Sequence, residues 1–183
     1  MTYRNYSAEI AEKIRDFLQE DDWKFSFDEV KGVFKFGLRI HSKLRKLSYI
    51  VDVKEDEYIV YGMLPIAADE DDPEMMAQVS EYVNRANYGL KNGCFELDFD
   101  DGEIRFKIYV DCDDQLPGRQ VIRNSIYCTA AMVDRYADGF GDIIFCGLSA
   151  KAAVEKREGP LREAIEAIES MSEDPFDEEE GDE

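Results

Sequence analysis

The sequence predicts an α+β fold, in which an antiparallel sheet made of a meander and a hairpin is packed by helices. Apolar and polar residues alternate over four successive segments between Trp23 and Leu64, as they do in strands with one covered face. Asp101-Gly102 then stands between two more alternating runs, which is a strong hairpin signal. Apolar residues at helical spacing precede, interrupt and follow these strands.

The first predicted helix begins after Ser7, a suitable N-cap, and runs to about Gln19. The alternating segments predict strands at residues 23–27, 34–40, 47–53 and 58–64. Asp72 is suited to capping a second helix, and Pro73 to its first position. We expect this helix to end near Asn87, where Gly89 supplies a permissive backbone.

The register of the predicted hairpin follows from placing Asp101 and Gly102 in a two-residue turn. That turn pairs Phe99 with Ile104, Leu97 with Phe106 and Phe95 with Ile108, which gives one wholly apolar face. On the other face Asp98 lies opposite Arg105 and Glu96 opposite Lys107, pairs that contribute roughly 0.2–1 kcal/mol each. Asp98, Asp100 and Glu103 lack the glycine spacing of a calcium loop, so we expect a solvated face there.

Helices are predicted again after the hairpin. One is expected from Arg119 to Tyr136, with Gly139, Gly141 and Gly147 breaking off a short apolar segment, residues 140–146. Another begins after Ser149 and ends at about Arg157, before Gly159-Pro160. The expected organisation is an α+β domain at residues 1–158, an additional helix at 159–172, striped by Leu161, Ile165, Ile168 and Met171, and an acidic tail without fixed structure at 173–183.

Charge and composition exclude several classes of function. The formal net charge is −20, and residues 173–183 hold eight acidic groups and no basic ones, which leaves −12 for the remainder. Nucleic-acid binding needs clusters of Lys and Arg, so it is not expected. No apolar run is long enough for a membrane span, and the N-terminus lacks a signal-peptide core. We therefore expect a cytoplasmic protein whose four scattered cysteines are free thiols.

No residue pattern indicates catalysis. His41 is the only histidine, and we expect it on the surface. Neither glycine-rich phosphate-binding motif is present, so no enzyme activity, cofactor or metal is expected. Lys43, Arg45 and Lys46 form one basic cluster, which could meet an acidic peptide, a phosphate or the chain's own tail. The alternative is that these charges suppress edge-to-edge aggregation of strands.

Two blocks of sequence resemble the YbjN-like family. The first spans residues 84–107 and the second residues 132–153, and the matching positions include Asn84, Arg85, Asn87, Tyr88, Gly93, Asp101, Gly102, Arg135 and Tyr136. Ala150-Lys151-Ala152 stands where the family often carries Pro-Glu-Glu. The resemblance covers Trp23 to Arg157. It implies a fold similar to type III secretion chaperones, a homodimer that binds partner segments, and a sensory-transduction regulator.

These observations favour a non-enzymatic, chaperone-like interaction module that binds a segment of a partner protein. The expected binding surface is an exposed apolar patch that includes Phe34, Phe36, Tyr49 and Val51, together with the basic cluster. The alternative hypothesis is a regulatory domain that senses a small molecule in a pocket between the sheet and the helices. Neither hypothesis names a catalytic residue.

Overall fold

The computed structural model describes residues 5–172. It contains one six-stranded antiparallel sheet. The strands follow the order β1-β2-β3-β4-β6-β5, so the meander and the hairpin join through β4 and β6. This arrangement confirms the predicted α+β fold. The strand bounds are β1 Phe25–Asp28, β2 Val33–Arg39, β3 Lys46–Val53, β4 Glu57–Ala67, β5 Cys94–Leu97 and β6 Glu103–Asp111.

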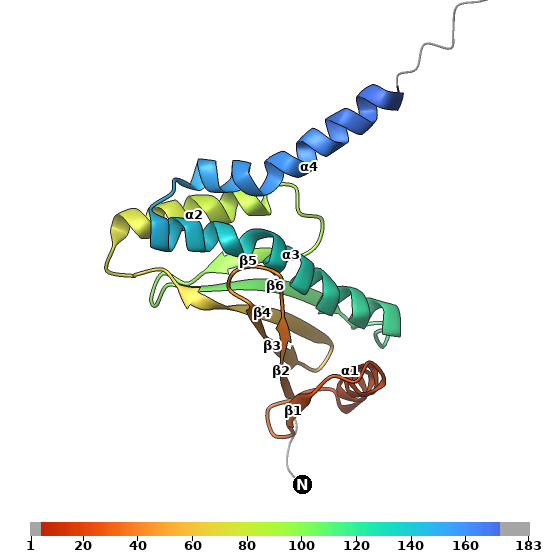
Figure 1. The fold of residues 1–183 in the computed structure, drawn as a ribbon. Helices are drawn as coiled ribbons and strands as arrows, with labels where there is room; N and C mark the ends of the chain where they lie inside the picture. Colours follow the sequence, from red (N-terminus) through yellow and green to blue (C-terminus); the bar gives the residue numbers. More distant parts are fainter. Residues whose placement is uncertain (1–4, 173–183) are drawn as a thin grey trace, which may run out of the picture.

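Four helices cover one face of this sheet in two layers (Figure 1). Helices α2 and α3 lie directly on the strands, α1 packs beside them near β1, and α4 lies over α2 and α3. The helices are α1 Ala8–Glu20, α2 Pro73–Asn87, α3 Arg119–Cys146 and α4 Ala150–Ser172. In the described part of the chain, none of them is long and apolar enough to span a bilayer.

The predicted helix starts are confirmed by their hydrogen bonds. The Ser7 hydroxyl accepts a bond from the Ile10 amide at 3.2 Å. Asp72 Oδ1 accepts bonds from the Glu74 and Met75 amides, both at 3.0 Å, and Pro73 occupies the first turn of α2. Each cap satisfies amide donors that a helix cannot pair internally.

The predicted hairpin register is wrong by two residues. Phe95 pairs with Phe106 and Leu97 with Ile104. The Asp98 amide donates to the Glu103 carbonyl at 2.9 Å, which leaves a four-residue loop, 99–102, in which only Gly102 has a positive φ. Asp101 instead accepts a bond from the Glu103 amide at 2.9 Å. A shift of two preserves the faces of the strands, so Phe95, Ile104, Phe106 and Ile108 remain buried while Phe99 moves into the exposed loop.

Glycines do not break α3, contrary to the prediction. The helix continues through Gly139 and Gly141 and ends at Gly147, whose left-handed φ of 65° closes it. The reason is packing: a Cβ at Gly139 would lie 1.9 Å from the Tyr82 hydroxyl oxygen. Gly139 therefore permits close contact between α3 and α2.

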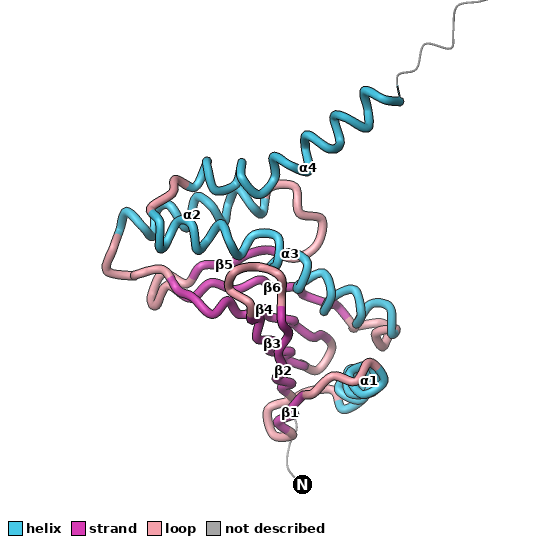
Figure 2. The backbone as a smooth tube through the Cα atoms, in the orientation of Figure 1, coloured by secondary structure: helices cyan, strands magenta, loops and turns pink. Residues whose placement is uncertain are grey.

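Gly159-Pro160 does not end α4 either. The helix includes Pro160 and continues to Ser172, and Figure 2 shows its second half turning away from the helical layer. A residue before proline normally clashes through its Cβ, and Gly159 has none. The predicted boundary at 158/159 therefore falls within one helix, and the predicted acidic tail lies outside the described residues.

Candidate functional site

The four aromatic and aliphatic residues expected to form an exposed patch are buried. Phe34, Tyr49 and Val51 have at most 1% of their surface exposed, and Phe36 has 8%. Their strand positions place them on the face that the helices cover, where Phe36 stacks on Tyr49 with ring centroids 4.7 Å apart. The prediction that these side chains form an exposed patch is therefore wrong, because the covered face was assigned to solvent.

The basic cluster is exposed: Lys43 and Arg45 lie in the loop between β2 and β3, and Lys46 is the first residue of β3. This loop is fixed to α3 by two carboxylates. Asp134 Oδ1 accepts a bond from the Ser42 amide and Asp138 Oδ1 one from the Lys43 amide, both at 2.7 Å. Exposed His41 also reaches Asp134, with 3.2 Å between Nδ1 and Oδ2.

Asp134, Asp138 and Asp142 form a row on α3 that the sequence interpretation missed, although their i, i+4, i+8 spacing is visible in the sequence. Lys156 and Arg157 of α4 meet this row, with Lys156 Nζ 2.7 Å from Asp142 Oδ2 and Arg157 Nη1 3.3 Å from Asp138 Oδ2. Burial acts to raise the pKa of Asp142, but Lys156, Lys43 and Arg157 bring it below its usual value. The row thus joins the β2–β3 loop, α3 and α4.

The side chain of Asn87 forms hydrogen bonds with the free edge of β5. Its side-chain amide donates to the Phe95 carbonyl at 3.0 Å, and its side-chain oxygen accepts from the Phe95 amide at 2.7 Å. Those two backbone groups point away from β6, so Asn87 takes the place of a neighbouring strand. Its neighbours in the sequence motif face solvent: Asn84 and Arg85 are exposed, and Tyr88 is 92% exposed.

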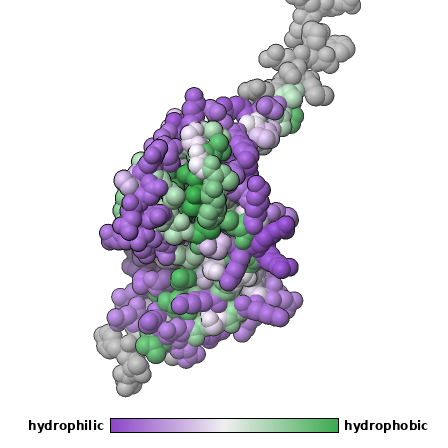
Figure 3. All heavy atoms as spheres, turned by 60° about the vertical axis from the view of Figure 1, so that its left-hand side comes forward, coloured by the Kyte–Doolittle hydropathy of each residue, from purple (hydrophilic) through white to green (hydrophobic). Residues whose placement is uncertain are grey.

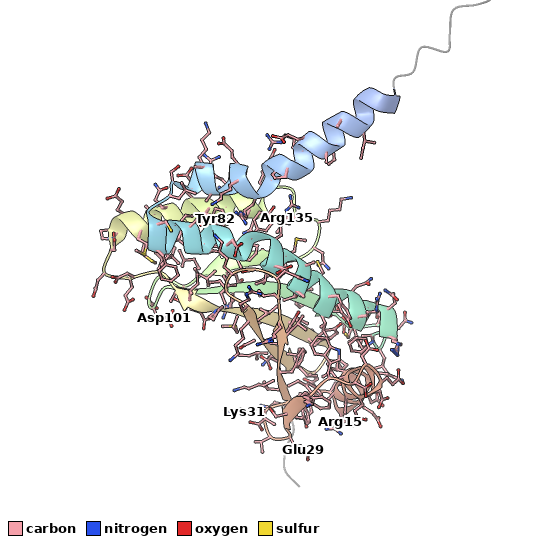
Figure 4. All side chains as sticks on the ribbon, in the orientation of Figure 1. Arg15, Glu29, Lys31, Tyr82, Asp101 and Arg135 are labelled. Carbon is pink, nitrogen blue, oxygen red and sulfur yellow. The ribbon has the colours of Figure 1, made fainter. Side chains whose placement is uncertain are left out.

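Gly93 and Gly102 fit close backbone turns. Both have positive φ, 79° and 69°. A Cβ at Gly93 would meet the Phe106 ring, and one at Gly102 would meet the Ala68 carbonyl. Figure 4 shows Asp101, which precedes Gly102 in the turn between β5 and β6, far from Arg15 and Glu29 near β1. These motif residues therefore shape the hairpin.

Tyr136 of α3 connects that helix to α2 and α4. The Tyr136 hydroxyl donates to Glu158 at 2.7 Å, and burial together with that bond raises its pKa to about 12. The Tyr82 hydroxyl donates to the Tyr136 carbonyl at 3.0 Å, and the Arg135 guanidinium lies 5.1 Å from the Tyr136 ring centre. Most family-motif positions thus support the fold rather than present chemistry to a ligand.

A groove lies where α2, α3 and α4 meet, at one end of the molecule. Its cavity holds about 300 Å³, and we call it the junction groove. Figure 3, which brings this end forward, shows an apolar surface surrounded by hydrophilic residues. The groove is lined by Asp72, Glu74, Met75, Gln78, Ile143, Ile144, Gly147, Leu148 and Ser149.

Hydrogen bonds fix the walls of the junction groove. The Gly147 amide donates to the Ile143 carbonyl at 3.0 Å and the Leu148 amide to the Asp142 carbonyl at 3.1 Å, which is the usual way a glycine closes a helix. The Ala150 amide donates to Gln78 Oε1 at 2.8 Å, so α2 is tied to the start of α4. Half-buried Met75, Ile144 and Leu148 form the floor, and Phe145 beside them is 68% exposed.

The uncovered face of the sheet and the free edge of β5 differ from this groove. On that face, the Arg105 guanidinium covers the Tyr61 ring at 4.7 Å and pairs with Glu96 at 2.8 Å. A larger cavity of about 500 Å³ follows β5, but Glu96, Asp98, Glu103 and Arg105 contribute much of its lining. Within residues 5–172, no three side chains gather as metal ligands.

Comparison with known proteins gives one family. The YbjN model, described as "Putative bacterial sensory transduction regulator", matches residues 11–142. No curated protein matches the chain. Among solved structures, "Crystal structure of YbjN, a putative transcription regulator from E. coli" is similar at 10% identity and a TM-score of 0.48, over 69% of this chain and 90% of that one.

Proposed function

The chain belongs to the YbjN family, and from this premise we propose that it is a non-enzymatic regulatory module whose junction groove binds a segment of a partner protein. One observation carries this proposal. Half-buried Met75, Ile144 and Leu148 line a cavity at the junction of the helices, and Phe145 beside it is 68% exposed, so this apolar surface is left partly open by the described residues. Exposed apolar surface with a polar rim is typical of a protein interaction site.

The shape of the groove favours a side chain or a short helix over an added strand. Its walls are α2, the end of α3 and the connection from α3 to α4, which present no free strand edge, whereas the edge of β5 is occupied at Phe95 by Asn87. Apolar anchors placed into a groove between helices are a common mode of peptide recognition. The small-molecule sensor remains the alternative, and a cavity of about 300 Å³ is at the lower end for such ligands.

Cys146 makes this proposal testable by cross-linking. Burial raises the pKa of the Cys94, Cys112 and Cys128 thiols, whereas Cys146 is exposed at the end of α3. A photoreactive maleimide on Cys146 of the full chain, activated in lysate, should join one protein through one recurrent peptide. Leu148→Asn should abolish that adduct and Val30→Asn, a change at an exposed site in the β1–β2 turn, should preserve it.

Two outcomes separate the alternatives. Adducts that persist in Leu148→Asn, or that scatter over many proteins, contradict segment binding in the groove. A metabolite that raises the unfolding temperature of the wild type but not of Leu148→Asn supports the sensor instead. The homodimer that the family resemblance implies stays a prediction, which light scattering of the full chain checks directly.

A further inference from the structure

We propose that the junction groove selects a cationic segment, in which Lys or Arg residues flank large apolar side chains; this inference rests on the proposed function of the groove. It identifies the partner by its chemistry. The evidence comes from the charges around the groove and from the last backbone carbonyls of α3, which border it.

Acidic side chains surround one side of the junction groove. Five acidic residues lie just before α2 and in its first turn, and we call them the acidic collar: Asp69, Glu70, Asp71, Asp72 and Glu74. Asp72 and Glu74 line the groove itself. None of the five forms an ion pair within residues 5–172. Asp72 and Glu74 are balanced in part by the positive end of α2. Asp69, Glu70 and Asp71 precede the helix and all three are exposed, and the Asp69 carboxylate accepts a bond from the Asp71 amide at 3.1 Å.

The end of α3 adds negative potential on the other side of the groove. This helix has 28 residues, and its last turn contains no basic side chain. Helix C-termini carry a partial negative charge that Lys or Arg normally complements. The capping bonds occupy the Asp142 and Ile143 carbonyls, whereas no described donor reaches the later carbonyls of Ile144 and Phe145. A cation supplied by a partner could occupy this position.

Charges nearby on the chain itself do not neutralise the groove. Lys151 is the closest basic residue in sequence, and it pairs with Glu155 at 3.9 Å. The start of α4 is capped by neutral acceptors, since Gln78 Oε1 accepts from Ala150 and the Ser149 hydroxyl from Ala152. Its partial positive charge of about half an elementary charge therefore remains, but it offsets only a small part of the five carboxylates of the acidic collar. An apolar floor between two negative margins therefore fits a segment that alternates large apolar and basic side chains.

The test uses fluorescence anisotropy with three synthetic helical peptides: one of Leu and Lys, one of Leu and Glu with the same pattern, and a scrambled Leu/Lys peptide. The full chain should bind the patterned Leu/Lys peptide and neither of the others. Asp69→Asn/Glu70→Gln/Asp71→Asn should weaken binding on the order of tenfold at ~50 mM salt, and by less than about twofold at ~0.5 M, where charges are screened. The variant keeps Asp72, the cap of α2.

A matched control separates the collar from the net charge of the protein. Glu55→Gln/Asp56→Asn/Asp113→Asn removes three exposed charges near the turn between β3 and β4, and it should leave affinity within about twofold of wild type. Equal weakening by both triple variants overturns the inference, because attraction would then be non-specific. Binding that survives Leu148→Asn also overturns it, because the peptide would lie elsewhere.

The two proposals can fail separately. If the Cys146 adduct depends on Leu148 but the collar variant captures the same partner equally well, the cationic segment is refuted and the groove stands. If the adduct is indifferent to Leu148, the proposed function itself fails. Tighter binding of the Leu/Glu peptide than of the Leu/Lys peptide would contradict the inferred chemistry outright.

Discussion

At the scale of single residues, Asn87 shows how one side chain can end a sheet. Its amide pairs with both outward backbone groups of Phe95, which would otherwise lie beside α2 without a partner. Asn87→Ala should lower the free energy of unfolding by about 1–3 kcal/mol, because a desolvated donor and acceptor lose their bonds. Asn87→Asp should also destabilise, since a carboxylate cannot donate to the Phe95 carbonyl. Urea unfolding checks both, and an equal loss in exposed Asn84→Ala would contradict this role.

Tyr58 determines part of the response to alkaline pH. Burial raises its pKa to about 12, above the value near 10 of an unfolded tyrosine. Between these two values the unfolded chain releases a proton that the folded chain keeps, so stability is complete below about pH 10 and falls toward pH 12. Tyr58→Phe should flatten that decline, and Ser125 still donates to the Ile122 carbonyl. An unchanged slope in urea titrations at rising pH would refute the assignment.

At the scale of elements, two glycines of α3 differ in their surroundings. A Cβ at Gly139 would overlap the Tyr82 ring, whereas one at Gly141 would have its nearest neighbour at 3.9 Å. Gly139→Ala should therefore destabilise by about 1–3 kcal/mol through overpacking. Gly141→Ala should stabilise by roughly 0.5–1 kcal/mol, because alanine favours the helix. Thermal unfolding compares the pair, and similar shifts in both would contradict the packing of α3 on α2.

The same elements show what the sequence could and could not predict. Ser7, Asp72 and Pro73 act locally, so the helix starts were predictable. Strand alternation identified which residues share a face, but the face with Phe34 and Phe36 was wrongly expected to be exposed. The hairpin register was not, because Asp101-Gly102 suits both two-residue and four-residue loops. Gly139 and Pro160 look like helix breakers until the neighbours that accommodate them are known. The junction groove is assembled from residues about 70 positions apart, which no local pattern indicates.

At the scale of the whole molecule, the described contacts that join α4 to the domain lie in its first half. Ala150 and Ala153 are fully buried, and Lys156 and Arg157 pair with the aspartate row, whereas Ile165 and Ile168 are exposed. A chain that ends at Gly159 should keep the stability of the full chain. One that ends at Ser149 should lose about 3 kcal/mol or more, because partly buried carboxylates lose their partners. Denaturant midpoints test this, and a large loss in the longer truncation would contradict it.

The central claim is that the end of the molecule where α2, α3 and α4 meet is its binding surface. Amide hydrogen exchange of the full chain, with and without the patterned Leu/Lys peptide, tests it most directly. Protection should rise at residues 72–78 and 143–149, which form the groove, and remain unchanged across β3 and β4. Protection confined to the uncovered face of the sheet, or absent from both helical segments while the peptide is bound, would contradict the claim.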